Sequence, residues 1–266
     1  MTSRAATRLA FAPLAAWALL AAIAAWLPLD ARAVRQGGVL AVLHAPGGGH
    51  PLGTDEVGRD VLAVLVLGAR ASLLLCLLAA ALAGVVGGAL GILAARRGVL
   101  GRALEVVVDA FLALPALAWA LVARGLAGDR GVVGLALVLG LAQAPAVARL
   151  VAGELARLHA APFVEATRAI GAGPRALARA LWPHLAPTLA LAIATTAAGT
   201  VLAEAVLAFL GIGLDAPSWG GLVRQAHAHG LRWWLAAPPV GALLVVVLAL
   251  QALADVYSSR QAPRAA

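Results

Sequence analysis

Carboxylates inside apolar runs are the residues of this chain with the clearest chemical potential. Glu204 lies within one long apolar run and Asp109 lies within another, shortly before Pro115. A charge at the centre of a lipid bilayer costs about 2.5–3.5 kcal/mol on insertion scales, so such residues face protein or water. Thr200 lies four residues before Glu204 on the same helical face, which predicts one polar stripe. Two interpretations stay open for Glu204, a packing residue or part of a translocation path, and packing or snorkelling is preferred for Asp109.

Other reactive side chains do not form a recognisable catalytic or cofactor site. The chain has no lysine, so the glycine cluster at 46–51 lacks the residue that a Walker loop needs. The histidines of the connecting segments lack the spacing of three or four residues that helical metal ligands use, so we predict no metal site and no cofactor. These histidines are His44, His50, His227 and His229. An intramembrane enzyme stays open as an alternative, but it needs Asp109 and Glu204 at one membrane level.

The elements that must position these residues are membrane-spanning helices. The chain is 63% hydrophobic and 12% charged, and its mean hydropathy is +0.95, which is outside the range of soluble domains. The net charge of +8 comes from dispersed arginines with few aromatic residues, which argues against nucleic-acid binding. About 20 helical residues cross the hydrocarbon core. The predicted spans are Leu9–Leu29, Ala71–Ala95, Ala103–Ala127, Gly131–Val151, Thr188–Ile212 and Leu235–Val256.

The distribution of arginine predicts the orientation of these spans. With a cytoplasmic N-terminus, 12 arginines fall in inner segments and 8 in outer ones, so both termini are expected inside. The first span also resembles a signal peptide, with Ala31-Arg32-Ala33 as a cleavage site, but its length favours a retained helix. The single cysteine, Cys76, excludes a disulfide framework.

Small and aromatic residues predict how the helices pack. The pairs Gly84/Gly88 and Gly87/Gly91 let another helix approach closely, as a fixed contact or a sliding one. Tryptophans at 219, 233 and 234 are expected at the outer headgroup boundary.

A polar, arginine-rich segment, residues 163–175, separates two of the apolar runs. Its residues predict a helix, a break at Gly171 to Pro174, and a second short helix that ends at Trp182-Pro183. The segment resembles the EAA loop of ATP-binding-cassette (ABC) importer permeases, which docks on a separate ATPase. By that resemblance six residues couple the chain to the ATPase: Glu165, Ala166, Arg168, Gly171, Gly173 and Arg175.

A second motif, residues 50–73, precedes the second span. Thr54 and Asp55 suit a helix N-cap with Glu56 in the first turn, and Arg59 and Asp60 are expected to pair. The motif is similar to the signature of the second permease of dipeptide, oligopeptide and nickel importers, although Ala63-Val64 replaces the usual Ser-Arg. The residues that carry this resemblance are Gly53, Thr54, Asp55, Gly58, Arg59, Asp60 and Arg70.

The two resemblances together imply an all-α membrane protein, with six transmembrane helices and a cytoplasmic coupling loop. The expected parts are a first helix (1–29), an extracytoplasmic segment (30–70), a five-helix core (71–256) that includes the coupling loop (162–183), and a cytoplasmic tail (257–266). Glu204, Thr200 and Asp109 are the candidates for the translocation path.

As a family member, the chain is expected to be a non-enzymatic permease subunit in the bacterial inner membrane. The implied partners are a second permease, two ATPase subunits and an extracytoplasmic binding protein. The implied mechanism is alternating access between two states. A short peptide is the preferred substrate and nickel the second. A secondary transporter stays open as an alternative of another class.

Overall fold

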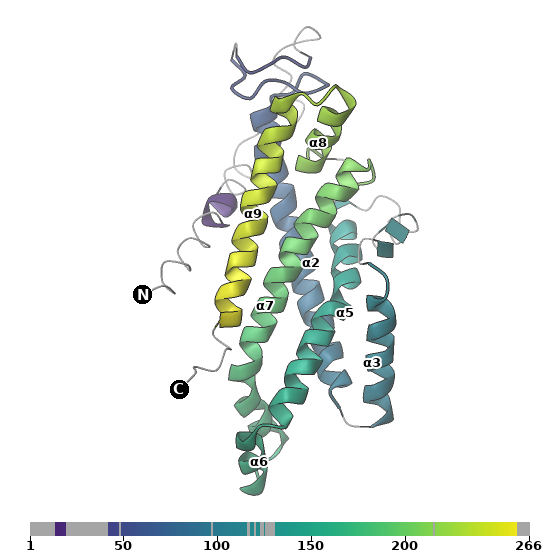
Figure 1. The fold of residues 1–266 in the computed structure, drawn as a ribbon, viewed down its shortest axis with the longest axis vertical. Helices are drawn as coiled ribbons and strands as arrows, with labels where there is room; N and C mark the ends of the chain where they lie inside the picture. Colours follow the sequence, from purple (N-terminus) through teal and green to yellow (C-terminus); the bar gives the residue numbers. More distant parts are fainter. Residues whose placement is uncertain are drawn as a thin grey trace.

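The computed structural model describes residues 14–19, 42–47, 49–96, 98–115, 118–119, 121–122, 125, 131–214 and 216–259. Seven named helices occur in this part of the chain: α2 (Val61–Ala94), α3 (Val99–Leu112), α5 (Gly131–His159), α6 (Pro162–Ala169), α7 (Pro174–Phe209), α8 (Trp219–Ala228) and α9 (Trp233–Ser259). Four long helices, α2, α5, α7 and α9, run along the long axis (Figure 1). The short helices α8 and α6 lie at opposite ends, which we call the α8 end and the α6 end.

Four of the helices are long and apolar enough to cross a membrane: Val61–Ala94, Gly131–His159, Pro174–Phe209 and Trp233–Asp255. They confirm an all-α membrane fold in the described region, where no strand occurs. The first predicted span, Leu9–Leu29, lies outside the described residues except for a helical piece at 14–19. Trp17 in that piece packs on Trp219, with ring centroids 6.4 Å apart, and its Nε1 donates to Ala69 O at 3.1 Å.

The predicted third span is wrong as one continuous helix. The helix α3 ends at Leu112, shortly before Pro115. Proline lacks an N–H donor and disfavours helical geometry in the residue before it, which explains a break here. Only Gly101 and Val108 of α3 are buried, so this helix presents most of its surface to the membrane or to another subunit.

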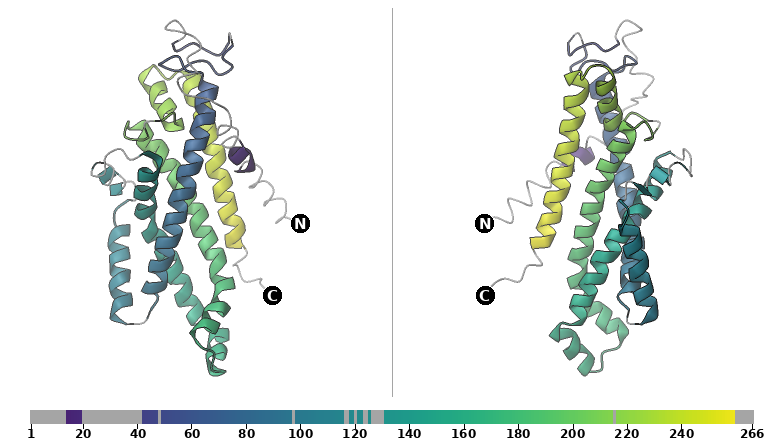
Figure 2. Two further views of the ribbon diagram at one scale, coloured as in Figure 1. Left: turned by 180° about the vertical axis from the view of Figure 1, so that it is seen from behind. Right: turned by 45° about the vertical axis from the view of Figure 1, so that its right-hand side comes forward.

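Helix α2 lies between α5 and α7 and contacts both (Figure 2). A Cβ added at Gly87 would lie 2.4 Å from Ala144 O, and one added at Gly91 would lie 2.6 Å from Ala148 O. The backbones of α2 and α5 therefore touch where only glycine fits. The other predicted pair faces α7, since a Cβ at Gly84 would lie 3.1 Å from Ile193 Cγ1.

These contacts set the height of each residue along the bundle. Arg70 and Arg96 bracket a stretch of 25 uncharged residues, most of which belong to α2. The middle of this stretch is Ala83. The Gly84–Ile193 contact therefore marks the middle of the apolar layer. Because α2 and α7 run antiparallel, residues near Ser72 lie at the height of Glu204, about 16 Å from that middle. Half of the hydrocarbon core is about 15 Å, so Glu204 lies near its boundary at the α8 end, not at its centre.

Candidate functional site

The coupling segment predicted at 162–183 forms a projection at the α6 end (Figure 1). Helix α6 begins at Pro162, where a missing N–H costs nothing, and carries Glu165 in its first turn. Val164 is fully buried and packs with Val151 and Leu185, so α6 is fixed to the ends of α5 and α7. The outer face of α6 is exposed, which leaves a polar helix surface available to another protein.

The turn after α6 explains the glycine of the motif. Gly171 has φ of +74°, a conformation that L side chains rarely adopt, and a Cβ there would meet nothing within 4 Å. Its N–H donates to Arg168 O at 2.9 Å, and Ala172 N–H donates to Thr167 O at 3.3 Å. All six predicted coupling residues are exposed: Glu165, Ala166, Arg168, Gly171, Gly173 and Arg175.

The predicted second short helix is wrong as a separate element. Helix α7 begins at Pro174 and continues through Pro183 and Pro187 to Phe209 without an interruption. Proline inside a membrane helix is tolerated because neighbouring groups satisfy the freed carbonyls. The coupling turn is therefore joined directly to the helix that carries Thr200 and Glu204.

The polar stripe of α7 is buried in the bundle. The Oγ1 of Thr200 donates to Thr196 O at 2.9 Å and accepts from Gln143 Nε2 of α5 at 2.8 Å. A Cβ at Gly199 would lie 2.7 Å from Gln143 Oε1, so this glycine makes room for the amide. Gln143 was not predicted as a site residue, although a glutamine within an apolar run is a visible signal in the sequence.

Glu204 is 1% exposed, and neither carboxylate oxygen has a hydrogen-bond partner among the described residues. The Oγ of Ser72, at the same height on α2, is also buried and lacks a partner in that part of the chain. A buried polar group without a partner costs about 1–3 kcal/mol. Three buried polar atoms at this height, the two carboxylate oxygens of Glu204 and Ser72 Oγ, thus have no hydrogen-bond partner among the described residues.

Asp109 lies apart from this stripe. Its carboxylate forms an ion pair with Arg149 of α5, and both side chains are about half exposed, at 51% and 61%. The sequence did not reveal Arg149 as the partner, because 40 residues separate the two. Asp109 and Glu204 do not form a paired-acid site.

The segment before α2 is clamped onto the α8 end. Asp55 is fully buried, and its Oδ2 accepts from Arg59 Nε at 2.6 Å, while its Oδ1 accepts from Arg59 N at 2.8 Å. Gly53 has φ of +72°, and a Cβ there would lie 2.4 Å from His44 O. Glu56 contacts His229 Nε2 at 3.1 Å. Asp55, Arg59 and Gly53 thus shape the segment itself, and Glu56 links it to α8, where its N–H also donates to Gln225 Oε1 at 3.3 Å.

Three predictions for this segment were wrong in detail. The N-cap of α2 is Asp60, whose Oδ1 accepts from Leu62 N at 2.8 Å, because α2 begins at Val61. Arg59 pairs with Asp55, and Asp60 pairs with His50 Nδ1 at 2.8 Å. Helix α2 also begins ten residues before the predicted span.

The tryptophans differ in their surroundings. Trp219 is buried and donates from Nε1 to Leu65 O at 2.9 Å, so its indole packs inside the protein and does not face the headgroups. Trp233 is 61% exposed.

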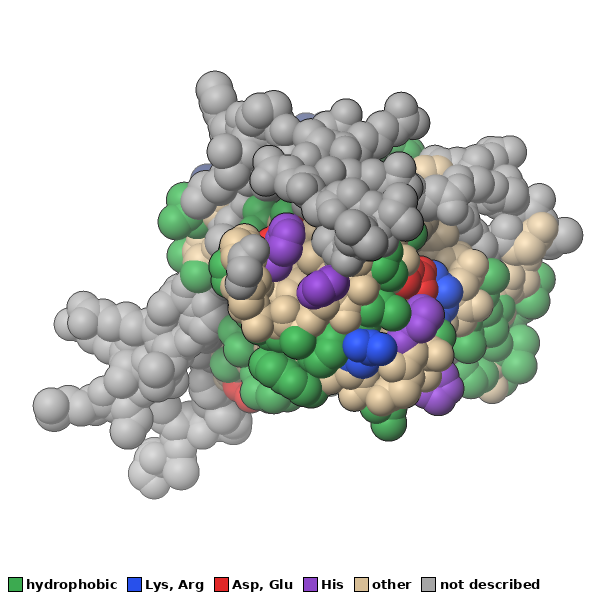
Figure 3. Space-filling view, turned by 90° about the horizontal axis from the view of Figure 1, so that it is seen from above, with side chains coloured by type: hydrophobic (Ala, Val, Ile, Leu, Met, Phe, Trp, Pro, Cys, Tyr) green, Lys and Arg blue, Asp and Glu red, His purple; other side chains and the backbone are tan. Residues whose placement is uncertain are grey.

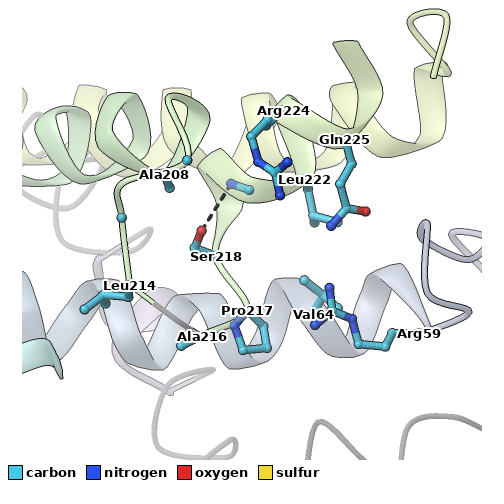
Figure 4. A pocket seen from close by; sticks show the side chains of 13 residues that line it. Arg59, Val64, Ala208, Leu214, Ala216, Pro217, Ser218, Leu222, Arg224 and Gln225 are labelled. Atoms are coloured by element: carbon cyan, nitrogen blue, oxygen red, sulfur yellow. Dashed lines mark hydrogen bonds between the residues drawn. The ribbon is translucent and has the colours of Figure 1, made fainter. Parts of the chain in front are cut away.

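The α8 end carries a cluster of polar and charged side chains. Figure 3 looks onto this end and shows histidine side chains close to basic and acidic ones. No group of three or more potential metal ligands occurs among the described residues. A polar cavity of about 160 Å³ opens between α8, the start of α2 and the loop that joins α7 to α8 (Figure 4). Arg59 and Arg224 line it from opposite sides.

Comparison with known proteins gives one family. A family model described as binding-protein-dependent transport system inner membrane component matches residues 87–263. A protein of Brucella suis biovar 1 named as a peptide transport system permease is 33% identical over 216 residues, which cover 79% of this chain and 72% of that protein. One of Brucella ovis, named as a peptide permease, is 32% identical over 252 residues, covering 90% and 80%. One of Sinorhizobium fredii, named as a peptide ABC transporter permease, is 33% identical over 222 residues, covering 80% and 74%.

Proposed function

Because this chain belongs to the family of binding-protein-dependent transport system inner membrane components, we propose that it is the permease subunit of an ATP-driven importer of short peptides. One observation carries the proposal: an exposed helix and glycine turn project from one end of an apolar bundle and are continuous with α7. The similar proteins of Brucella and Sinorhizobium are named for peptide transport, so we infer a peptide rather than nickel as substrate.

In this proposal the chain lies in the bacterial inner membrane, with the α6 end and both termini on the cytoplasmic side. ATP hydrolysis takes place on a separate subunit, because the sequence has no lysine for a Walker loop. Glu165, Ala166 and Arg168 form the docking surface for the ATPase, together with Gly171, Gly173 and Arg175. A second permease completes the path, two ATPase subunits dock on the α6 ends, and a binding protein delivers the peptide to the α8 end.

Three side chains are proposed for the translocation path. The Asp109–Arg149 pair is half exposed within an apolar region, and a charged pair facing lipid there is costly. We therefore place this face toward water or the second permease. Thr200 and Glu204 lie inside the bundle and change their surroundings when α7 moves. The path opens alternately to each side as ATP brings the ATPases together.

Co-purification and reconstitution test the function. A tagged chain is purified with its subunits, placed in proteoliposomes and supplied with the binding protein and a labelled dipeptide. ATP-dependent uptake is expected, together with a stable ATPase in the purified complex. Uptake driven by an ion gradient through the chain alone would refute the proposal in favour of a secondary transporter.

A topology measurement tests the orientation separately. Ala172 lies in the turn after α6, and the native Cys76 is buried, so a maleimide should label only a cysteine introduced at position 172. The Ala172→Cys variant is expected to react after the cells are opened and to resist an impermeant reagent in intact cells. Labelling of intact cells from outside would reverse the assignment of the two ends.

A further inference from the structure

A groove of about 550 Å³ lies at the α6 end, between the ends of α2 and α5 and the start of α7. Its volume is within the range of ligand sites. Most of its walls are apolar. The large apolar side chains that line it are Ile92, Leu155, Leu177, Leu181, Trp182 and Leu185. Trp182 is 59% exposed, which leaves a large aromatic surface uncovered in this chain.

Cationic side chains also line this apolar groove. Arg96 at the end of α2 and Arg168 of α6 line it and are exposed, and His159 at the end of α5 joins them. No aspartate or glutamate is among the lining residues of the groove. Within the described part of the chain, neither guanidinium has an ion-pair partner, whereas Arg149 and Arg157 each do. The groove therefore combines apolar walls with uncompensated positive charge.

The height of the groove places it at the membrane boundary. Arg96 ends the uncharged stretch that begins after Arg70, and Gly91 of α2 faces Val151 of α5 just above the groove. Counted from the middle at Ala83, Arg96 lies about 20 Å away along α2. That is a few ångströms beyond the half-thickness of about 15 Å. Counted in the same way from Ile193, Leu185 lies about 12 Å and Trp182 about 16 Å from the middle. The apolar walls therefore extend across the hydrocarbon boundary, and Arg96 lies among the headgroups.

We propose that this groove binds an anionic phospholipid of the cytoplasmic leaflet, whose phosphate contacts Arg96 and whose upper acyl carbons lie on Trp182 and Leu185. Basic pockets between membrane helices on the cytoplasmic side bind anionic headgroups. A phospholipid has its apolar chains toward the membrane interior and its negative charge toward the cytoplasm. The groove presents its apolar walls and its positive charge in the same order. The inference goes beyond the transport function and depends on the α6 end being cytoplasmic.

Quenching of Trp182 fluorescence by brominated lipid tests the proposal directly. The assembled transporter in detergent is titrated with brominated phosphatidylglycerol or brominated phosphatidylcholine. The signal of the Trp182→Phe variant is subtracted, because the chain has seven tryptophans. The anionic lipid is expected to quench at concentrations at least several-fold lower. Arg96→Gln should raise the half-quenching concentration about fivefold, which corresponds to about 1 kcal/mol for one arginine.

Arg102→Gln is the matched control, because Arg102 is exposed at the same end but does not line the groove. It is expected to leave the quenching curve unchanged. Equal quenching by the two lipids would overturn the proposal and indicate ordinary annular lipid. Quenching in the isolated chain but not in the assembled transporter would also overturn it, because a partner subunit would then cover the groove. These readouts measure lipid contact, so they stay interpretable whatever substrate the transporter carries.

Discussion

Replacing Glu204 by leucine is expected to stabilise the protein while it impairs transport. Both carboxylate oxygens are buried and lack partners among the described residues, and an unsatisfied buried group costs about 1–3 kcal/mol. Leucine has a similar volume and no polar atom, so Glu204→Leu should recover about that amount in the conformation described here. If the carboxylate contacts water or a hydrogen-bond partner in the other transport state, Glu204→Leu destabilises that state relative to the one described here. The transport cycle then slows.

The assay measures thermal unfolding and ATP-dependent uptake on the same reconstituted preparations. Glu204→Leu is expected to raise Tm and to reduce uptake several-fold. Glu204→Gln keeps shape and polarity, so its Tm should stay close to that of the unmodified protein and its uptake should be reduced less. Thr200→Val is the comparison for a satisfied polar group, since it leaves Gln143 Nε2 without its 2.8 Å acceptor and should lower stability.

Two results would refute this reasoning. A lower Tm for Glu204→Leu would mean that the carboxylate already has a favourable partner in the assembled transporter. Unchanged uptake with a raised Tm would mean that Glu204 has no part in the transport cycle.

Three further predictions concern packing, the exposed ion pair and coupling. Gly87→Val should lower stability by about 1–3 kcal/mol in a thermal unfolding assay, because its Cβ would lie 2.4 Å from Ala144 O, whereas Gly153→Val should be neutral because nothing lies within 4 Å. Reversing either charge of the Asp109–Arg149 pair should reduce uptake and reversing both should restore part of it, with a coupling energy of about 0.2–1 kcal/mol if the pair faces water; the lack of any rescue would show that the pair is not functional. Glu165→Lys should abolish uptake with normal insertion and unchanged Tm, because the side chain is exposed; normal uptake and ATPase association would remove α6 from the coupling surface.

Helix positions were predictable from composition, whereas helix ends and partners were not. The apolar runs predicted α2, α5, α7 and α9, because a helix satisfies its backbone hydrogen bonds internally, as lipid requires. The N-cap of α2 was misplaced because Asp55 and Asp60 both suit an N-cap in sequence. Only the folded segment distinguishes them: Asp55 turns inward to Arg59, and its backbone oxygen accepts from Leu43 N at 3.0 Å.

The side-chain partners depend on contacts between distant segments. Gln143 and Thr200 are 57 residues apart in sequence, and their hydrogen bond depends on how α5 packs against α7. Spacing along the chain cannot report such a contact, because each helix has several faces and the neighbour of each face is set by the whole bundle. The glycine turn at 171 was predictable because its cause is local, a positive φ after a short helix.

The packing of the bundle separates a rigid pair from a helix that is able to move. Gly87 and Gly91 bring the backbones of α2 and α5 together, and a displacement there would break contacts that only glycine permits. Helix α7 meets α2 at Gly84 through the flexible side chain of Ile193, so small shifts cost less. Because α7 is continuous from Pro174 to Phe209, a displacement of the coupling turn is transmitted along about 45 Å of helix to the height of Glu204. The unsatisfied carboxylate therefore lies where a movement of α7 against α2 and α5 would change its surroundings.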